Sequence, residues 1–207
     1  VPARPTISRL TLLTALCNIV VPLFFARFAW EHATAFIHSL RISNLLFMTK
    51  EILDVYFYLR KSNARVVSTS TYAWVIATFG TAAPLLFRPS HDGSDLWAAT
   101  LIQVLGAALQ LLAILSLNRS FGLVAANRGI KTDGMYRLVR HPLYLTYLIS
   151  QLGYVLNYPT TYNFCILVIA TGVQVLRIFE EERLLLQDPE YADYAKRTRW
   201  RLVPLVF

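Results

Sequence analysis

The sequence is poor in charged residues. Asp, Glu, Lys and Arg make up 15% of its 207 residues, whereas an ordinary soluble domain has about 25%. Hydrophobic residues reach 56% and the mean hydropathy is +0.46, so the chain has too much apolar surface to remain disordered. This balance argues against a soluble domain and predicts a small polytopic membrane protein.

Cysteine and glycine are also scarce. The two cysteines, Cys17 and Cys165, are too few for a disulfide-stabilised scaffold. Both lie within apolar runs, so we expect two packed thiols and no bridge. Eight glycines and nine prolines exclude a collagen-like or low-complexity chain.

Familiar motifs of soluble enzymes are missing. The sequence contains no glycine-rich nucleotide loop, no nucleophile elbow and no HExxH helix. Its four histidines have no metal-ligand spacing with the cysteines, so we expect no metal. The net charge of +8 is divided among clusters between apolar runs, which is typical of membrane topology and argues against nucleic acid as a partner.

Apolar runs divide the chain into candidate membrane spans at residues 10–30, 42–59, 72–87, 96–117, 143–156 and 162–179. They predict an all-α fold, a polytopic transmembrane helical bundle with five to six spans, six being favoured. Residues 1–117 would form the N-terminal transmembrane helices. Residues 118–207 would form a C-terminal, cofactor-binding core of loops and short helices, with a helical hairpin and a polar tail.

The second candidate span, residues 42–59, carries charges that are costly at membrane depth. Lys50 and Asp54 are four residues apart and can pair on one helix face, with Glu51 beside them. We interpret the segment as a helix that turns this face to the bundle interior. An interfacial amphipathic helix is the alternative.

Basic residues give an orientation to the six-span arrangement. Nearly all loop lysines and arginines fall on one side, and Arg41 and Arg88 are the exceptions. The positive-inside rule then places both termini, the loop before Arg140 and the tail in the cytoplasm, as in an integral protein of a bacterial inner membrane.

Two polar clusters in the C-terminal third could carry chemistry. Residues 134–144 and 177–182 flank the short hydrophobic hairpin, so the chain leaves and returns to the same side of the membrane. The clusters would bring a histidine, arginines, tyrosines and glutamates together, which suits a zwitterionic or charged ligand.

Each of these residues also has a plainer interpretation. Arg140 could be a positive-inside anchor, and Tyr136 and Tyr144 could belong to an aromatic belt. His141 could cap the helix that follows. Arg177, at the end of an apolar run, is a functional candidate, or the ion-pair partner of Glu181 four residues later.

The order and spacing of these residues resemble the isoprenylcysteine carboxyl methyltransferase family. The matching elements are Gly134-Met135-Tyr136, Arg140-His141-Pro142-Leu143-Tyr144, Glu181-Glu182 with Leu185, and Asp188-Pro189-Glu190-Tyr191 with Tyr194. The resemblance covers roughly residues 118–207, which would thus be a methyltransferase core. It departs from the family at Met135, at the additional acid Glu180 and at Asp188-Pro189.

The resemblance implies S-adenosylmethionine as the methyl donor. By position, His141, Tyr144 and Leu143 would lie at the polar end of the donor, with Arg140 suited to its carboxylate. Tyr136 and the segment Gly129-Ile130-Lys131 would line the nucleoside side. Glu181 would contact the donor with Glu182 close by. Arg177 matches the arginine that faces an acceptor carboxylate.

The implied activity is methylation, most simply carboxyl O-methylation, of a lipophilic isoprenoid or lipid acceptor that enters from the bilayer. No protein partner is implied. Phospholipid N-methyltransferases show a related pattern. Membrane sterol reductases, which use NADPH, resemble the same region and have a basic run like Arg199-Trp200-Arg201 before a proline. A membrane protein without catalytic activity is a further alternative.

Overall fold

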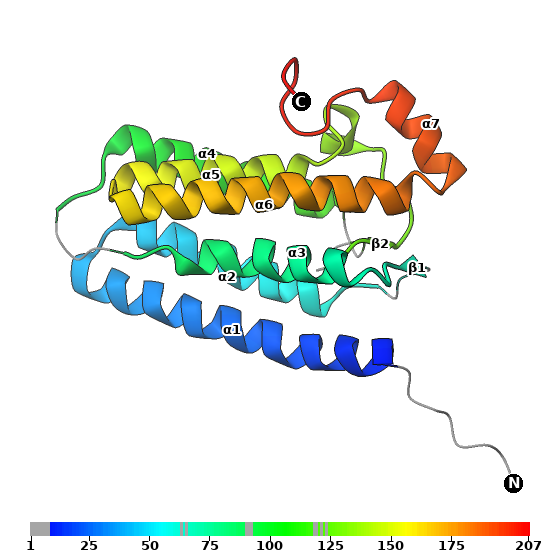
Figure 1. Ribbon diagram of the computed structural model, residues 1–207. Helices are drawn as coiled ribbons and strands as arrows, with labels where there is room; N and C mark the ends of the chain where they lie inside the picture. Colours follow the sequence, from blue (N-terminus) through cyan, green and yellow to red (C-terminus); the bar gives the residue numbers. More distant parts are fainter. Residues whose placement is uncertain are drawn as a thin grey trace, which may run out of the picture.

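The computed structural model describes residues 9–62, 64, 66–89, 93–117, 120, 122 and 124–207, with the side chains of residues 9–14 and Cys17 left out. The described chain is mostly helical (Figure 1). Its elements are α1 (Arg9–Ser39), α2 (Ile42–Leu59), β1 (Val66–Val67), α3 (Thr71–Ala82), η1 (Ala83–Leu86), α4 (Trp97–Leu117), β2 (Ala126–Asn127), η3 (Gly134–Arg137), α5 (Pro142–Asn157), α6 (Thr161–Leu185) and α7 (Pro189–Arg197).

The all-α prediction is confirmed, with a small exception. Strands β1 and β2 form a two-stranded antiparallel ladder that pairs Val66 with Asn127, which the apolar runs did not indicate. Helix α2 has the predicted bounds, whereas α1 and α6 continue beyond their apolar runs to Ser39 and Leu185. The additional turns of α6 carry the three consecutive glutamates.

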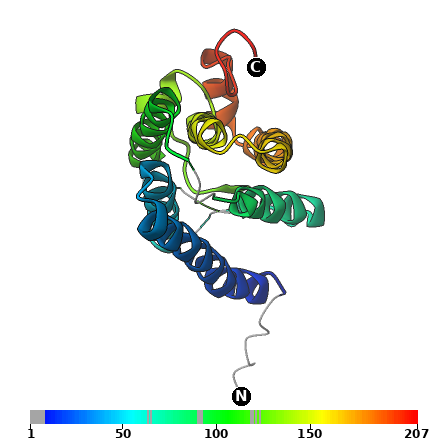
Figure 2. The same ribbon diagram turned by 90° about the vertical axis from the view of Figure 1, so that its left-hand side faces the viewer.

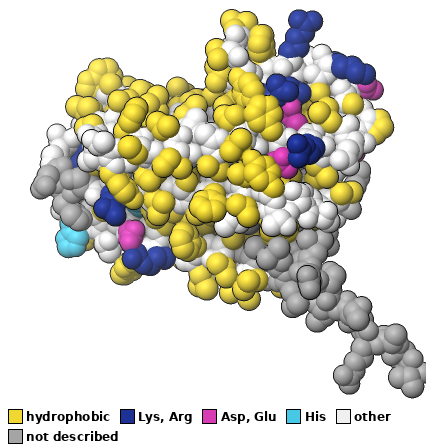
Figure 3. All heavy atoms as spheres, in the orientation of Figure 1, with side chains coloured by type: hydrophobic (Ala, Val, Ile, Leu, Met, Phe, Trp, Pro, Cys, Tyr) yellow, Lys and Arg dark blue, Asp and Glu magenta, His cyan; other side chains and the backbone are white. Residues whose placement is uncertain are grey.

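Two helices, α4 and α6, are long and apolar enough to cross a membrane, and α3 with η1 is a shorter apolar segment. Figure 3 shows hydrophobic side chains over the middle of one face, with Lys and Arg toward its two ends. The outward-facing residues of α4 and α6 include Leu101, Leu105, Leu112, Leu115, Phe164, Val168 and Ile169. This apolar surface is typical of a membrane protein. The count of five to six spans stays a prediction.

One cysteine prediction is wrong. Cys165 is a free but exposed thiol on α6, among the outward-facing apolar side chains. An apolar run of a membrane helix contacts lipid as well as protein, so membership of the run does not bury a thiol. Cys17 has no described side chain.

Helices α1 to α6 run back and forth between the two ends of the bundle, and β1, β2, α7 and the C-terminus share one end (Figures 1 and 2). Helices α4 and α5 lie close together. A Cβ added to Gly153 would lie 2.6 Å from the backbone nitrogen of Gln103, and one added to Gly106 would lie 2.6 Å from that of Ser150. These glycines therefore let the two backbones meet.

The opposite end of the bundle is fixed around Arg41, which is buried in the turn between α1 and α2. Its Nε donates to Asp95 Oδ1 at 2.8 Å, and its guanidinium lies 3.9 Å from the centre of the Tyr158 ring. Burial alone would raise the pKa of Asp95, but hydrogen bonds from Ser43 and the Arg41 charge outweigh it and hold that pKa below its ordinary value. The cluster joins α2, the start of α4 and the end of α5.

Candidate active site

The start of α5 is held by the C-terminal segment. The backbone amides of Arg140 and His141 donate to the carbonyls of Trp200 at 2.9 Å and Arg201 at 2.8 Å. Pro142 follows as the first helical residue of α5, where its missing N–H leaves no bond unmade. The tail therefore fixes the backbone from which the His141 side chain projects.

The contact between the C-terminal segment and the start of α5 forms a junction, and Glu182 is its ionic centre. Its carboxylate lies 3.2 Å from Arg140 Nε, lies 3.3 Å from His141 Nε2 and accepts from Arg201 Nε at 2.7 Å. Its side chain is 4% exposed, and a buried carboxylate of this kind is stable only with such partners. Glu182 thus binds α6 to the start of α5 and to the tail.

Glu181 points differently, because neighbouring residues of a helix project about 100° apart. It accepts a hydrogen bond from the Tyr144 hydroxyl and lies 3.8 Å from His141 Nδ1. The rings of His141 and Tyr144 stack with their centres 5.8 Å apart. Glu180 pairs with Arg183 at 3.1 Å, so the three glutamates have three different surroundings.

Arg177 lies one turn before Glu181 on α6 and is buried. Its Nη1 donates to Gln174 at 3.2 Å, and its Nη2 lies 4.0 Å from Glu181. The guanidinium is 5.1 Å from the centre of the Tyr144 ring. The ion pair with Glu181 therefore exists, but it is longer than a hydrogen-bonded pair.

Three tyrosines pack together beside η3. Tyr194 donates to the carbonyl of Tyr136 at 2.6 Å, and the rings of Tyr191 and Tyr194 meet edge to face. Burial raises the pKa of all three hydroxyls, that of Tyr194 to about 12. The Tyr191 hydroxyl is buried with no hydrogen-bond partner, and such a group needs a partner from a ligand or water.

The loop before η3 is anchored to the start of α7. Asn127 donates to Asp188 at 2.7 Å and accepts from the Gly129 amide at 2.9 Å. Gly129 has φ of 99°, a left-handed conformation that favours glycine, and a Cβ there would meet nothing within 4 Å. The segment Gly129-Ile130-Lys131 therefore follows a fixed path beside open space.

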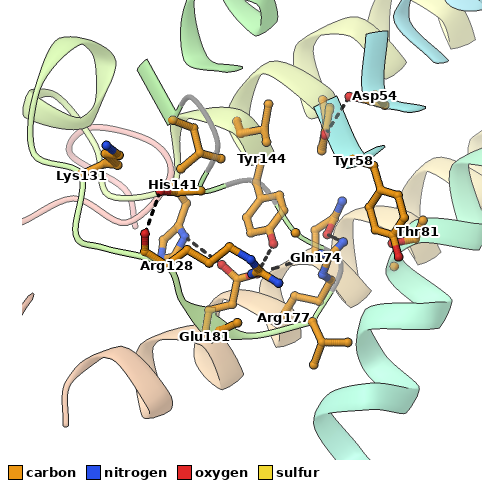
Figure 4. A pocket seen from close by; sticks show the side chains of 18 of the residues that line it. Asp54, Tyr58, Thr81, Arg128, Lys131, His141, Tyr144, Gln174, Arg177 and Glu181 are labelled. Atoms are coloured by element: carbon orange, nitrogen blue, oxygen red, sulfur yellow. Dashed lines mark hydrogen bonds and ion pairs between the residues drawn. The ribbon is translucent and has the colours of Figure 1, made fainter. Parts of the chain in front are cut away.

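Many of these groups line one cavity of about 170 Å³. Figure 4 shows His141, Tyr144, Arg177 and Glu181 converging at its centre, with Asp54 and Tyr58 on the far side from Lys131. Of the residues singled out from the sequence, the lining contains Gly129, Ile130, Lys131, Tyr136, Arg140, His141, Leu143, Tyr144, Arg177 and Glu181. Glu182 is not among the described lining residues, because it faces the junction behind His141. The donor and acceptor roles of these residues stay predictions.

The sequence pattern missed several lining residues. They include Lys50, Glu51, Asp54, Tyr58, Gly80, Thr81, Arg128, Tyr147, Gln174, Tyr191 and Tyr194. Tyr191 and Tyr194 belong to the last of the matching motifs, to which the resemblance gives no role in the site. The spacing of the charges on α2 predicts that one face of the helix points inward. Nothing in the sequence indicates that this face lines the same cavity as His141.

Residues 98–187 match the model of the isoprenylcysteine carboxyl methyltransferase family. Over this segment the chain is similar to that family. The match runs from α4 through α6 and so includes most of the cavity wall, whereas α1, α2 and α3 lie before it. No curated protein matches the chain.

The family segment and the cavity do not coincide completely. Helices α2 and α3, before the segment, and α7, after it, also contribute lining residues. The matched segment contains His141, Tyr144, Arg177 and Glu181, but not the residues of α2 and α3 on the facing wall.

Proposed function

We propose that this protein is a membrane methyltransferase that uses S-adenosylmethionine to methylate a carboxylate on a lipophilic acceptor. The observation that carries the proposal is the convergence of His141, Tyr144, Arg177 and Glu181 on one cavity, within a segment of the isoprenylcysteine carboxyl methyltransferase family. The match to that family favours a membrane methyltransferase. The donor, the acceptor class and O-methylation are the finer parts of the proposal.

The chemistry of the cavity wall fits this donor. S-adenosylmethionine carries a carboxylate, an ammonium and a sulfonium, and supplies an electrophilic methyl group when bound. Glu181 can accept a hydrogen bond from the ammonium or balance the charge of the sulfonium. The cationic side chains of Arg140 and Arg177 suit carboxylates. The unpartnered Tyr191 hydroxyl offers a hydrogen-bonding group on the tyrosine side of the cavity, where we place the nucleoside.

An apolar acceptor has its own wall. Val21 and Phe25 of α1 and Leu85 of η1 line the same cavity as Arg177. An alkyl chain or isoprenoid between these side chains would remain in apolar surroundings while its polar end reaches Arg177. The planar guanidinium can hold a carboxylate through two parallel hydrogen bonds.

Methyl transfer needs orientation more than covalent help from the protein. A carboxylate is already a nucleophile, so the site requires no general base. Arg177 would align the carboxylate, with Gln174 fixing the guanidinium at 3.2 Å, and the buried wall would exclude water. Positioning of this kind can supply several kcal/mol, and up to about 7–11 kcal/mol in well-oriented reactions.

The decisive experiment compares ligands on the detergent-purified chain. S-adenosylhomocysteine should raise the melting temperature, because a ligand that binds only the folded state stabilises it. NADPH should not. Stabilisation by NADPH alone would refute the methyltransferase proposal and favour a reductase. Labelled donor and fractionated lipid extracts would then identify the acceptor, and a base-labile methyl ester would distinguish O-methylation from N-methylation.

A further inference from the structure

Helix α2 contributes a buried polar cluster to the cavity. Lys50, Glu51 and Asp54 are each 5% exposed or less, and all three line the cavity that contains His141 and Arg177. Lys50 Nζ donates to Glu51 at 2.6 Å and to Asp54 at 3.2 Å. The predicted pairing of Lys50 with Asp54 on an inward face is therefore confirmed.

Asp54 has a structural role in this cluster. One of its carboxylate oxygens accepts from Gln110 of α4 at 2.9 Å and from Tyr147 of α5 at 3.2 Å, and the other accepts from Lys50. Both oxygens are thus satisfied by protein donors on three helices. The bonds hold α2 against α4 and α5.

Glu51 differs from Asp54 in having one carboxylate oxygen without a hydrogen-bond partner. Its Oε1 accepts from Lys50, but its Oε2 is buried with no hydrogen-bond partner. The side chain is 1% exposed. A buried acceptor without a donor costs free energy, and this one belongs to a residue of the cavity wall, so a ligand can provide the donor.

The cluster is connected to the proposed methyl-transfer centre through two tyrosines of α5. Tyr147 donates to Asp54, and its ring centre lies 6.2 Å from that of Tyr144, which in turn bonds to Glu181. Two polar centres therefore share one cavity. The cluster contains two carboxylates and one ammonium, so it favours a group that donates hydrogen bonds.

We propose that Glu51 binds a second polar group of the acceptor, an ammonium or hydroxyl that donates a hydrogen bond to its unpartnered oxygen. The acceptor is then a lipophilic molecule with two polar groups, a carboxylate at Arg177 and a hydrogen-bond donor at Glu51. This assignment of substrate class rests on the proposed function. The recognition of the donor group by Glu51 is a binding event and can be measured without turnover.

The test uses the full chain in lipid nanodiscs and four twelve-carbon probes: dodecylamine, dodecanol, dodecanoate and dodecane. Dodecylamine or dodecanol, or both, should raise the melting temperature more than dodecane does, and the comparison of the two identifies the donor group. Glu51→Gln keeps an acceptor for Lys50 but removes the charged oxygen. It should weaken the preferred probe by about tenfold or more, as expected for a hydrogen bond to a charged group.

Glu31→Gln is the matched control, because Glu31 is a half-exposed residue of α1 paired with Arg27 and is not among the described lining residues. It should leave every probe unchanged. If Glu51→Gln fails to fold, Glu51→Asp keeps the charge and withdraws it by one methylene, with the same loss expected. Equal effects of all four probes, or a preference that survives both Glu51 variants, would overturn the proposal.

S-adenosylhomocysteine separates this result from the proposed function. Its stabilisation should persist in folded Glu51→Gln, because the variant removes no group assigned to the donor. Absence of that stabilisation in the wild-type chain would instead refute the proposed function. The response of the probes to Glu51 would still decide whether the second polar site exists.

Discussion

Gly80 on α3 leaves the space that the Arg177 side chain occupies. A Cβ added to Gly80 would lie 2.5 Å from Arg177 Cδ and 3.3 Å from Gln174 Oε1. The first contact is shorter than van der Waals distance and involves the middle of the arginine side chain, so the guanidinium cannot stay in place. We therefore predict that Gly80→Ala displaces the arginine that would align the acceptor.

The expected stability change has two opposing parts. Alanine is favoured over glycine in a helix by about 0.8–1.0 kcal/mol, whereas overpacking of a filled interior costs about 1–3 kcal/mol. Gly80→Ala should thus change the free energy of unfolding by between about zero and 2 kcal/mol of net destabilisation. Gly172→Ala on α6 is the matched control, because a Cβ there meets nothing within 4 Å, and it should be neutral or stabilising.

Two assays check the prediction. Melting temperatures in detergent should place Gly80→Ala below Gly172→Ala. Once an acceptor is available, methyl transfer by Gly80→Ala should fall by tenfold or more, about 1.4 kcal/mol in the barrier, while Gly172→Ala keeps the wild-type rate. A Gly80→Ala protein as stable as the Gly172→Ala control and equally active would refute the packing argument.

Three further predictions concern single side chains. His141→Ala and Glu181→Ala should each weaken S-adenosylhomocysteine binding by about 1.5–3 kcal/mol, the value of a hydrogen bond to a charged group; calorimetry that finds both affinities unchanged would contradict the site assignment. Arg177→Lys should keep that affinity but slow methyl transfer by about tenfold, because lysine lacks the planar fork, and full activity would defeat the orienting role. Asp95 has a lowered pKa, so its contribution to stability is complete above its ordinary pKa of about 3.9 and is lost as the pH falls through the lower folded value. The melting temperatures of wild type and Asp95→Asn should therefore differ at pH 6, begin to converge below about pH 4 and meet only below the folded pKa of Asp95, and a constant difference would exclude this linkage.

The helices were largely predictable because membrane segments are long and apolar. Helix α2 begins and ends where its apolar run does, and Lys50 with Asp54 faces inward as the four-residue spacing indicates. The extension of α6 through Glu182 was not predictable from the apolar run, because these turns are stabilised by polar contacts with the tail. Long-range partners such as Arg201 leave no local sequence signal.

The different roles of the adjacent glutamates illustrate the same limit. Helical geometry requires Glu181 and Glu182 to project in different directions, so the sequence implied that one would face the site more directly. The resemblance favours Glu181, but helical geometry alone cannot make this choice, because it depends on where Arg140, His141 and Arg201 lie. Their contacts take Glu182 away from the cavity and leave Glu181 facing it.

Polar residues carry the information about orientation that apolar residues lack in a membrane helix. Leucine, valine or cysteine can face lipid or protein, as exposed Cys165 demonstrates, whereas a buried amide or charge in such a helix must turn toward a partner. Gln110 of α4 and Gln174 of α6 obey this rule, since both are buried and hydrogen-bonded to other side chains. Applied to α2, the rule also places Glu51 inside the bundle. Packing leaves its second oxygen without a protein donor, and the proposed second polar group of the acceptor would supply that donor.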